Sequence, residues 1–175
     1  MRLTVWMMCI ILTGVVCCWG IAFGDDQNGS PAEVIKSRIA NFHKIRDALK
    51  GIRDQVRKSD PALPEIQQFA GRIQSLGSQI PTWFPPGTDA AAQAKDRIGT
   101  SHRVSSGSSG KEDGKTRAKN EIWTRRSAFE DAHKRFLAEA QKMNEIARSG
   151  DKAALLAQYE VLGQACKNCH NTFRE

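Results

Sequence analysis

The sequence predicts an all-α fold, an antiparallel four-helix bundle, on three observations. Apolar residues recur at steps of three and four in four separate stretches, as they do on the inner faces of amphipathic helices. No stretch alternates between apolar and polar residues as a half-buried strand does. The 175 residues are 40% hydrophobic and 26% charged, a composition typical of one soluble domain. Four amphipathic helices in one domain favour a bundle.

Residues 1–24 form a segment of their own, which we interpret as a cleaved export signal. Arg2 is its only charged residue, and a long apolar run follows. The small residues Ala22 and Gly24 fit a cleavage site after Gly24. The run is also long enough to span a bilayer, so an uncleaved anchor is the alternative. With cleavage, the mature chain 25–175 is expected in the periplasm and off the membrane.

The first predicted helix begins at "SPAE", residues 30–33. Ser30 is a preferred N-cap residue, Pro31 suits the first helical position, and Glu33 can complete a capping box. The apolar stripe that follows consists of Ile35, Ile39, Phe42, Ile45, Leu49, Ile52 and Val56. This pattern predicts a long amphipathic helix.

The second predicted helix follows a short break at Asp60, Pro61 and Pro64. Its apolar stripe consists of Ile66, Phe69, Ile73, Leu76 and Ile80. It ends in "IPTWFPPGT", residues 80–88, which holds three prolines and one glycine.

Residues 88–118 are expected to form a flexible insertion between the two halves of the bundle. Residues 101–115, "SHRVSSGSSGKEDGK", are polar and rich in serine and glycine. A short helix at "DAAAQAKDRI", residues 89–98, is compatible with the composition. We assign the insertion no role.

The third and fourth predicted helices complete the bundle. The third begins at "NEIW", residues 120–123, and Gly150 and Asp151 are placed to stop it and cap the fourth. The stripe of the third helix is Ile122, Phe129, Phe136, Met143 and Ile146. The stripe of the fourth is Leu155, Tyr159, Leu162, Cys166, Cys169 and Phe173. The first and third connections are therefore short and the middle one is long.

The chemistry is concentrated in "CKNCH", residues 166–170. On a helix, Cys166, Cys169 and His170 share one face, because they are three and four positions apart. That arrangement suits two thioether bonds to one edge of a porphyrin, with the imidazole reaching the iron. Export agrees with a covalently attached haem, and an apolar stripe provides room for a bulky group.

Three other interpretations of "CKNCH" fit less well. A structural zinc site takes four protein ligands, whereas this cluster offers three, and the other mature histidines, His43, His102 and His133, stand alone. A thioredoxin-type dithiol belongs in a βαβ setting, which the pattern lacks. A structural disulfide leaves His170 without a role. Haem attachment is the interpretation we adopt.

The first helix adds one polar residue to the predicted core. At 100° per residue, Arg38 falls inside the apolar stripe. Its guanidinium could meet an anionic haem propionate, or it could lie at the bundle end and reach water. His43 falls about 117° from the stripe centre, which favours a surface position over iron ligation. Met143 is expected in the core.

The net charge of +7 carries little functional information. It could suit an acidic partner or a membrane surface, but a solvated basic surface is the simpler interpretation. No nucleic-acid-binding motif accompanies the charge, so we expect no nucleic-acid partner.

Four motifs, in order along nearly the whole mature chain, carry a family resemblance: "VIKSR", "FPPGT", "NEIW" and "CKNCHNTFR". With them the sequence resembles the class II c-type cytochromes, meaning cytochromes c′ and six-coordinate relatives such as cytochrome c-556. The haem motif alone is common to all c-type cytochromes, and its place at the extreme C-terminus makes the match specific.

The resemblance implies a role for six residues. It implies one haem c bound through Cys166 and Cys169, with His170 as the axial ligand. Arg38 matches the family arginine that contacts a propionate. Arg174 matches a basic residue close to the proximal histidine, although a cation at a helix C-terminus is favourable in any case. Phe42 matches the position that faces the iron on the distal side.

The resemblance also sets the expected function. An apolar Phe42 implies a five-coordinate iron with an open distal side, one-electron transfer, and binding of nitric oxide and carbon monoxide. The alternative is a six-coordinate, low-spin electron carrier with His43 or another residue as distal ligand. An enzyme such as a weak peroxidase ranks below both, since the distal stripe offers no clear acid–base residue.

The expected partners are less defined. The resemblance favours a homodimer through the first two helices, whereas the redox partner protein is not identified. Ser37 and Ile39 replace the tyrosine and glutamine that often flank the family arginine. Those replacements weaken the inference about dimer contacts and the haem edge.

Overall fold

The computed structural model describes residues 29–99 and 115–175. The helices are α1 (Pro31–Val56), α2 (Leu63–Ser78), α3 (Ala90–Gly99), α4 (Glu121–Thr124), α5 (Arg126–Ser149) and α6 (Lys152–Phe173), with a 3₁₀ turn at Ile80–Trp83. Within those two ranges there is no strand, and one isolated antiparallel bridge joins Ala118 to Arg174. The proposed export signal and residues 100–114 of the expected insertion lie outside the described residues.

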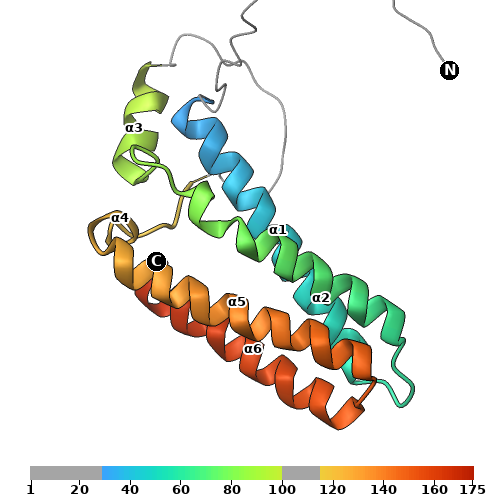
Figure 1. The fold of residues 1–175 in the computed structure, drawn as a ribbon. Helices are drawn as coiled ribbons and strands as arrows, with labels where there is room; N and C mark the ends of the chain where they lie inside the picture. Colours follow the sequence, from blue (N-terminus) through green and yellow to red (C-terminus); the bar gives the residue numbers. More distant parts are fainter. Residues whose placement is uncertain (1–28, 100–114) are drawn as a thin grey trace, which may run out of the picture.

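Four of the helices form the predicted antiparallel bundle. Figure 1 shows α1 and α2 lying side by side across from α5 and α6, with α3 standing beside the start of α1. The core is built from the predicted stripes, and its largest fully enclosed side chains are Phe129, Ile35, Ile52, Ile66, Ile73, Ile122, Met143, Leu155 and Leu162. Among the described helices, none is both long and apolar enough to cross a membrane.

The helix ends follow the sequence signals. Ser30 and Glu33 form a reciprocal capping box at the start of α1. Gly150 ends α5 with a φ of 75°, the left-handed conformation that glycine adopts without strain. Asp151 then accepts a hydrogen bond from the Ala154 amide at 3.0 Å and caps α6. The caps at Gly150 and Asp151 set where α5 ends and α6 begins.

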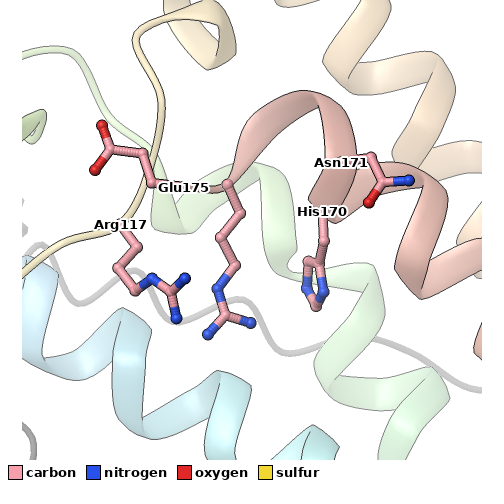
Figure 2. Close-up of a pocket in the computed structure, with 5 residues that line it drawn as sticks. Arg117, His170, Asn171 and Glu175 are labelled. Carbon is pink, nitrogen blue, oxygen red and sulfur yellow. The ribbon is translucent and has the colours of Figure 1, made fainter.

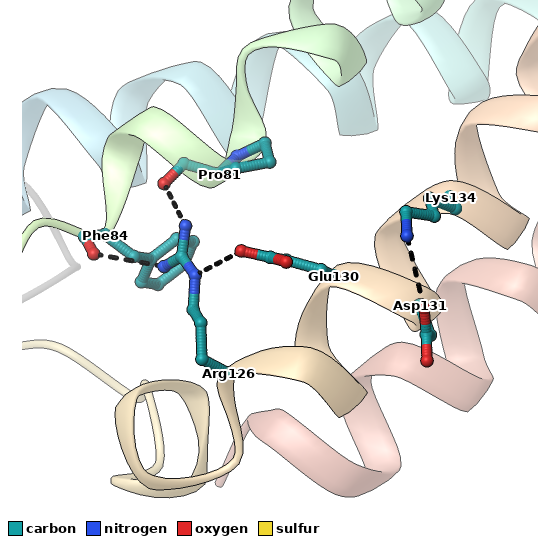
Figure 3. A network of polar contacts seen from close by, with 6 residues as sticks. All are labelled: Pro81, Phe84, Arg126, Glu130, Asp131 and Lys134. Carbon is teal, nitrogen blue, oxygen red and sulfur yellow. Dashed lines mark hydrogen bonds and ion pairs between the residues drawn. The ribbon is translucent and has the colours of Figure 1, made fainter.

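The third predicted helix is divided, which the sequence did not predict. The backbone at Arg125 leaves the helical region (φ −122°, ψ 49°), so that α4 and α5 are separate. The next side chain, Arg126, donates to the carbonyl oxygens of Pro81 (3.2 Å) and Phe84 (3.5 Å), as Figure 3 shows. Arg126 also pairs with Glu130 at 2.9 Å. The helix is therefore interrupted just before Arg126, the first residue of α5, which binds the segment that follows α2.

The segment from Ile80 to Thr88 is fixed by side chains from other elements. It carries three prolines, which have no amide hydrogen to donate. Its carbonyl groups accept instead: Trp123 donates its indole N–H to Pro85 at 3.1 Å, and Arg126 and Arg38 reach further carbonyls. The aromatic rings of Trp83 and Phe84 are thereby held inside the protein, where both are buried.

Candidate functional site

The "CKNCH" motif lies in the last two turns of α6, as predicted. Cys166 and Cys169 are half-buried free thiols that pack against the hydrophobic core. Both of them, with His170, line one cavity between α1 and α6. Their shared helix face brings the three side chains together without help from any other element.

The cavity has a volume of about 560 Å³. Small-molecule and cofactor sites commonly occupy about 300–1,000 Å³. Apolar side chains make up much of its wall: Ile39, Phe42, Ile45, Leu49, Ile80, Phe84, Ala118, Ile122, Phe129, Phe136 and Phe173. The space can therefore enclose a large, mainly apolar group beside the two thiols.

The two thiols are kept in their neutral form. Burial, and to a smaller extent the neighbouring Cys169, raises the pKa of Cys166 to about 11. Burial also raises the pKa of Cys169, although Arg135 acts in the opposite direction. A reactive redox cysteine has a lowered pKa, whereas burial raises the pKa of both thiols here, which argues against the dithiol interpretation.

His170 is favoured as a neutral imidazole. Partial desolvation lowers its pKa below the usual value, and the positive charges of Arg174 and then Arg117 lower it further. A neutral imidazole is the form that binds a metal ion.

Residues 117–119 pair with residues 173–175, and this paired segment, here called the C-terminal strap, brings Arg117 to His170. The Glu175 amide donates to the Arg117 carbonyl at 2.9 Å, and the Lys119 amide donates to the Phe173 carbonyl at 3.0 Å. Figure 2 shows the side chains of Arg117 and His170 extending to the same side, with the Glu175 carboxylate turned away. Sequence reasoning missed Arg117, because nothing in the local pattern predicts the pairing of residues 117–119 with 173–175. Arg174 lies in the same strap, in the cavity wall beside His170.

Phe42 presents an aromatic ring to the cavity from α1. Its ring makes an edge-to-face contact with Trp83 (centroids 5.2 Å apart) and a tilted contact with Phe84 (6.2 Å). The side chain has no atom that can coordinate a metal. His43, the next residue, is half-buried and also lines the cavity, which the helical stripe did not predict. The cavity-facing arc of α1 is wider than the stripe.

Arg38 is buried, with 3% of its surface exposed, so the alternative that its guanidinium reaches water is wrong. Nη1 donates to the Trp83 carbonyl (3.4 Å) and to Thr88 Oγ1 (3.3 Å). Nη2 donates to the Thr88 carbonyl (3.0 Å) and to Thr116 Oγ1 (2.9 Å). All four acceptors are neutral, and burial lowers the pKa of Arg38 to about 10.

The remaining metal-binding candidates do not assemble. Met143 is completely buried in the core, as expected, and is outside the cavity lining. The His133 ring lies 2.9 Å from the Gly77 carbonyl oxygen, between α5 and α2. Among the residues that the structure describes, no three His, Cys, Asp or Glu side chains are grouped so as to hold a metal ion by themselves.

The residues present fit a covalently attached haem. Two neutral thiols and one neutral imidazole share a face of α6, and an apolar cavity opens beside them. Arg38 places a positive charge in the wall of that cavity, and no carboxylate of the described residues pairs with it. An anionic propionate would compensate a charge that the protein itself leaves uncompensated.

Known proteins support this interpretation. The family model described as Cytochrome C′ matches residues 104–174. A cytochrome c′ of Rhodospirillum rubrum is 30% identical over 149 residues, covering 85% of this chain and 86% of that protein. A cytochrome c′ of Rubrivivax gelatinosus is 35% identical over 150 residues, covering 85% and 99%. In fold, the chain is similar to a mutant cytochrome c prime from Alcaligenes xylosoxidans solved as a nitric oxide complex (TM-score 0.65, 20% identity, covering 84% of this chain and 98% of that one).

Proposed function

Because this chain belongs to the cytochrome c′ family, whose members carry one covalently attached haem c, we propose that Cys166 and Cys169 form the two thioether bonds and that His170 is the proximal iron ligand. Cytochromes c′ are periplasmic electron-carrying or gas-binding haem proteins. We further propose that residues 1–24 direct export and that the mature domain is 25–175.

The observation that carries the proposed function is the position of Phe42. It lines the same cavity as His170 but comes from α1, and its ring cannot ligate iron. The haem supplies a one-electron couple and one coordination position for a diatomic gas. Phe42 would exclude water from that position and would offer no hydrogen bond to a polar ligand such as dioxygen. The side chain therefore favours nitric oxide and carbon monoxide, with one-electron transfer alongside.

Two arginines complete the proposed haem site. Arg38 would face a propionate, which supplies the anion that its buried charge lacks. Arg174 would keep the proximal imidazole neutral, since its charge lowers the pKa of His170. A homodimer through α1 and α2 follows from the family resemblance, and the redox partner protein stays unassigned.

A second candidate function has one observation in its favour. His43 lines the cavity next to Phe42, so an imidazole is available on the distal side. Were it to reach the iron, the protein would be a low-spin, six-coordinate electron carrier closed to gases.

The visible spectrum of the ferrous protein tests the two candidates directly. The proposed function requires a high-spin spectrum that shifts strongly when carbon monoxide is added. A low-spin spectrum that carbon monoxide leaves unchanged would support the second candidate instead. In that case His43→Leu should convert the protein to high spin, which identifies the ligand.

The variant Phe42→Met tests the distal assignment. A thioether at this position can coordinate iron, so the ferrous spectrum should become low-spin. Met143 is buried away from the cavity, so a methionine ligand in this variant could come only from position 42 among the described residues. A spectrum that stays high-spin would show that Phe42 does not face the iron.

A further inference from the structure

Arg38 has almost no hydrogen-bonding capacity left for a haem propionate. A guanidinium carries five N–H donors in a fixed fork. Nη1 uses its two donors on Trp83 and Thr88, and Nη2 uses its two on Thr88 and Thr116. The distance to Thr116 Oγ1, 2.9 Å, is the shortest of the four. At most the Nε–H is left for any other acceptor.

The four bonds tie together two segments that are far apart in the sequence. Thr88 closes the proline-rich segment after α2, and its hydroxyl also donates to the Pro85 carbonyl at 2.8 Å. Thr116 precedes α4, and its amide donates to Gln93 of α3 at 2.9 Å. Arg38 is therefore the point at which α1, the proline-rich segment and residues 115–118 are joined.

The same guanidinium fixes the aromatic wall of the cavity. Its central carbon lies 4.4 Å from the centroid of the Phe84 ring, a cation–π distance. The Trp83 carbonyl accepts from it, so both aromatic residues of the segment are held by one side chain. Trp83 and Phe84 are also the two residues whose rings contact Phe42.

We propose that Arg38 is a positioning residue for gas binding: it holds Trp83 and Phe84 against Phe42 and so sets how easily Phe42 yields to a diatomic ligand. A ligand approaching the distal side must displace the Phe42 ring, and the ring can move only as far as its two aromatic neighbours allow. The inference rests on the proposed function, since it needs an open distal side. This positioning role differs from a contact with a propionate, for which the positive charge of Arg38 alone would be enough.

Removing the two threonine hydroxyls that accept from Arg38 distinguishes a tethering role of this side chain from a role of its charge. The double variant Thr88→Val/Thr116→Val removes the acceptors of two of the four bonds and leaves the guanidinium in place, although it also removes the hydroxyl contacts with Pro85 and Ala118, which Arg38→Lys retains. Thr82→Val is the matched control: Thr82 is exposed on the 3₁₀ turn, and its hydroxyl donates to the Gln79 carbonyl, away from Arg38. Arg38→Lys gives the complementary change, since lysine keeps the charge but cannot form the planar fork.

Two measurements on the haem-loaded protein are needed. Carbon monoxide association with the ferrous protein, followed after flash photolysis, should be roughly fivefold faster in the double variant and in Arg38→Lys. Amide hydrogen exchange in peptides covering residues 83–88 should be faster in the same variants, because the segment opens more often. The reduction potential of the double variant should stay at the wild-type value, and Thr82→Val should match wild type throughout.

The outcomes are distinguishable. If the double variant keeps the wild-type rates of carbon monoxide association and of amide hydrogen exchange, the inference is overturned. The role of Arg38 would then be limited to supplying a positive charge opposite the propionate. Faster association with no change in exchange would also overturn it, because the segment would not have been released. A wild-type protein that does not respond to carbon monoxide refutes the proposed function instead, and exchange then still reports on the tether. If the double variant does not load haem, each single threonine variant, which keeps three of the four bonds, should show both changes to a smaller degree.

Discussion

Replacing Phe42 by leucine should open the distal side to gases without changing its chemistry. Leucine is apolar and, like phenylalanine, has no atom that binds iron. What it lacks is the aromatic ring that meets Trp83 and Phe84. The variant therefore isolates the contribution of the ring contacts to gas exclusion.

The size of the effect follows from those two contacts. Aromatic pairs at these separations are worth about 0.5–1.5 kcal/mol each beyond their burial, so the two together contribute about 1–3 kcal/mol. A ligand that moves the Phe42 ring aside loses that stabilisation on the way to the iron. At about 1.4 kcal/mol per tenfold, the barrier corresponds to a factor between about 5 and 150. We expect an increase in the association rate near the lower end of this range, about fivefold, because a displaced ring keeps some contacts.

Flash photolysis of the ferrous carbon monoxide complex measures this rate directly. Phe69→Leu serves as the matched control. Phe69 is a half-buried phenylalanine of α2 that packs on Gly51 of α1, outside the cavity wall. Its replacement should lower the thermal midpoint but leave the association rate at the wild-type value.

An association rate for Phe42→Leu within about twofold of wild type would refute the reasoning. Such a result would mean that the Phe42 ring does not have to move when the gas binds. A rate that rose equally in Phe69→Leu would refute it as well, because the effect would then reflect general loosening of the bundle.

The remaining predictions concern the proximal side. Partial burial, followed by the positive charges of Arg174 and Arg117, lowers the pKa of His170, so protons compete only weakly for its ring. Removing one of these charges in Arg174→Gln should raise the pH at which acid detaches the imidazole from the iron, as measured by a Soret absorbance titration. The control variant Arg72→Gln, at an exposed position, should leave that pH unchanged. Cys166→Ala and Cys169→Ala should each keep the haem covalently bound through the other thioether, and only the double variant should release it to acidic butanone; release from either single variant would show that one cysteine forms no thioether.

The bundle was predictable because its helices carry long, regular apolar stripes. The four stripes correspond to the packed faces of α1, α2, α5 and α6, and the caps at Ser30 and Asp151 form as expected. Each of these signals is local: a helix face and a cap depend on residues within a few positions of each other. The motif "CKNCH" is local in the same way, so the sequence alone is enough to identify it.

The parts that were not predicted depend on contacts between distant segments. The helix break at Arg125 has no glycine or proline to announce it, and it accompanies the reach of Arg126 to Pro81 and Phe84. The approach of Arg117 to His170 depends on backbone pairing with the C-terminus. Helical angles alone placed His43 on the surface, although the cavity wall includes it.

The basic charge of the chain gains a more specific interpretation from the cavity. Five of its wall residues are cationic, namely Arg38, Arg46, Lys115, Arg117 and Arg174, and the described wall contains no aspartate or glutamate. Arg46 is offset by its exposed neighbour Asp47 at 3.2 Å, but Arg38 is buried among neutral acceptors. A solvated surface requires no such asymmetry, because exposed charges of both signs are well hydrated. A cavity built for a propionate-bearing group does require it, because burying two carboxylates without cations would be costly. Part of the +7 net charge is therefore better explained by the haem than by the solvent.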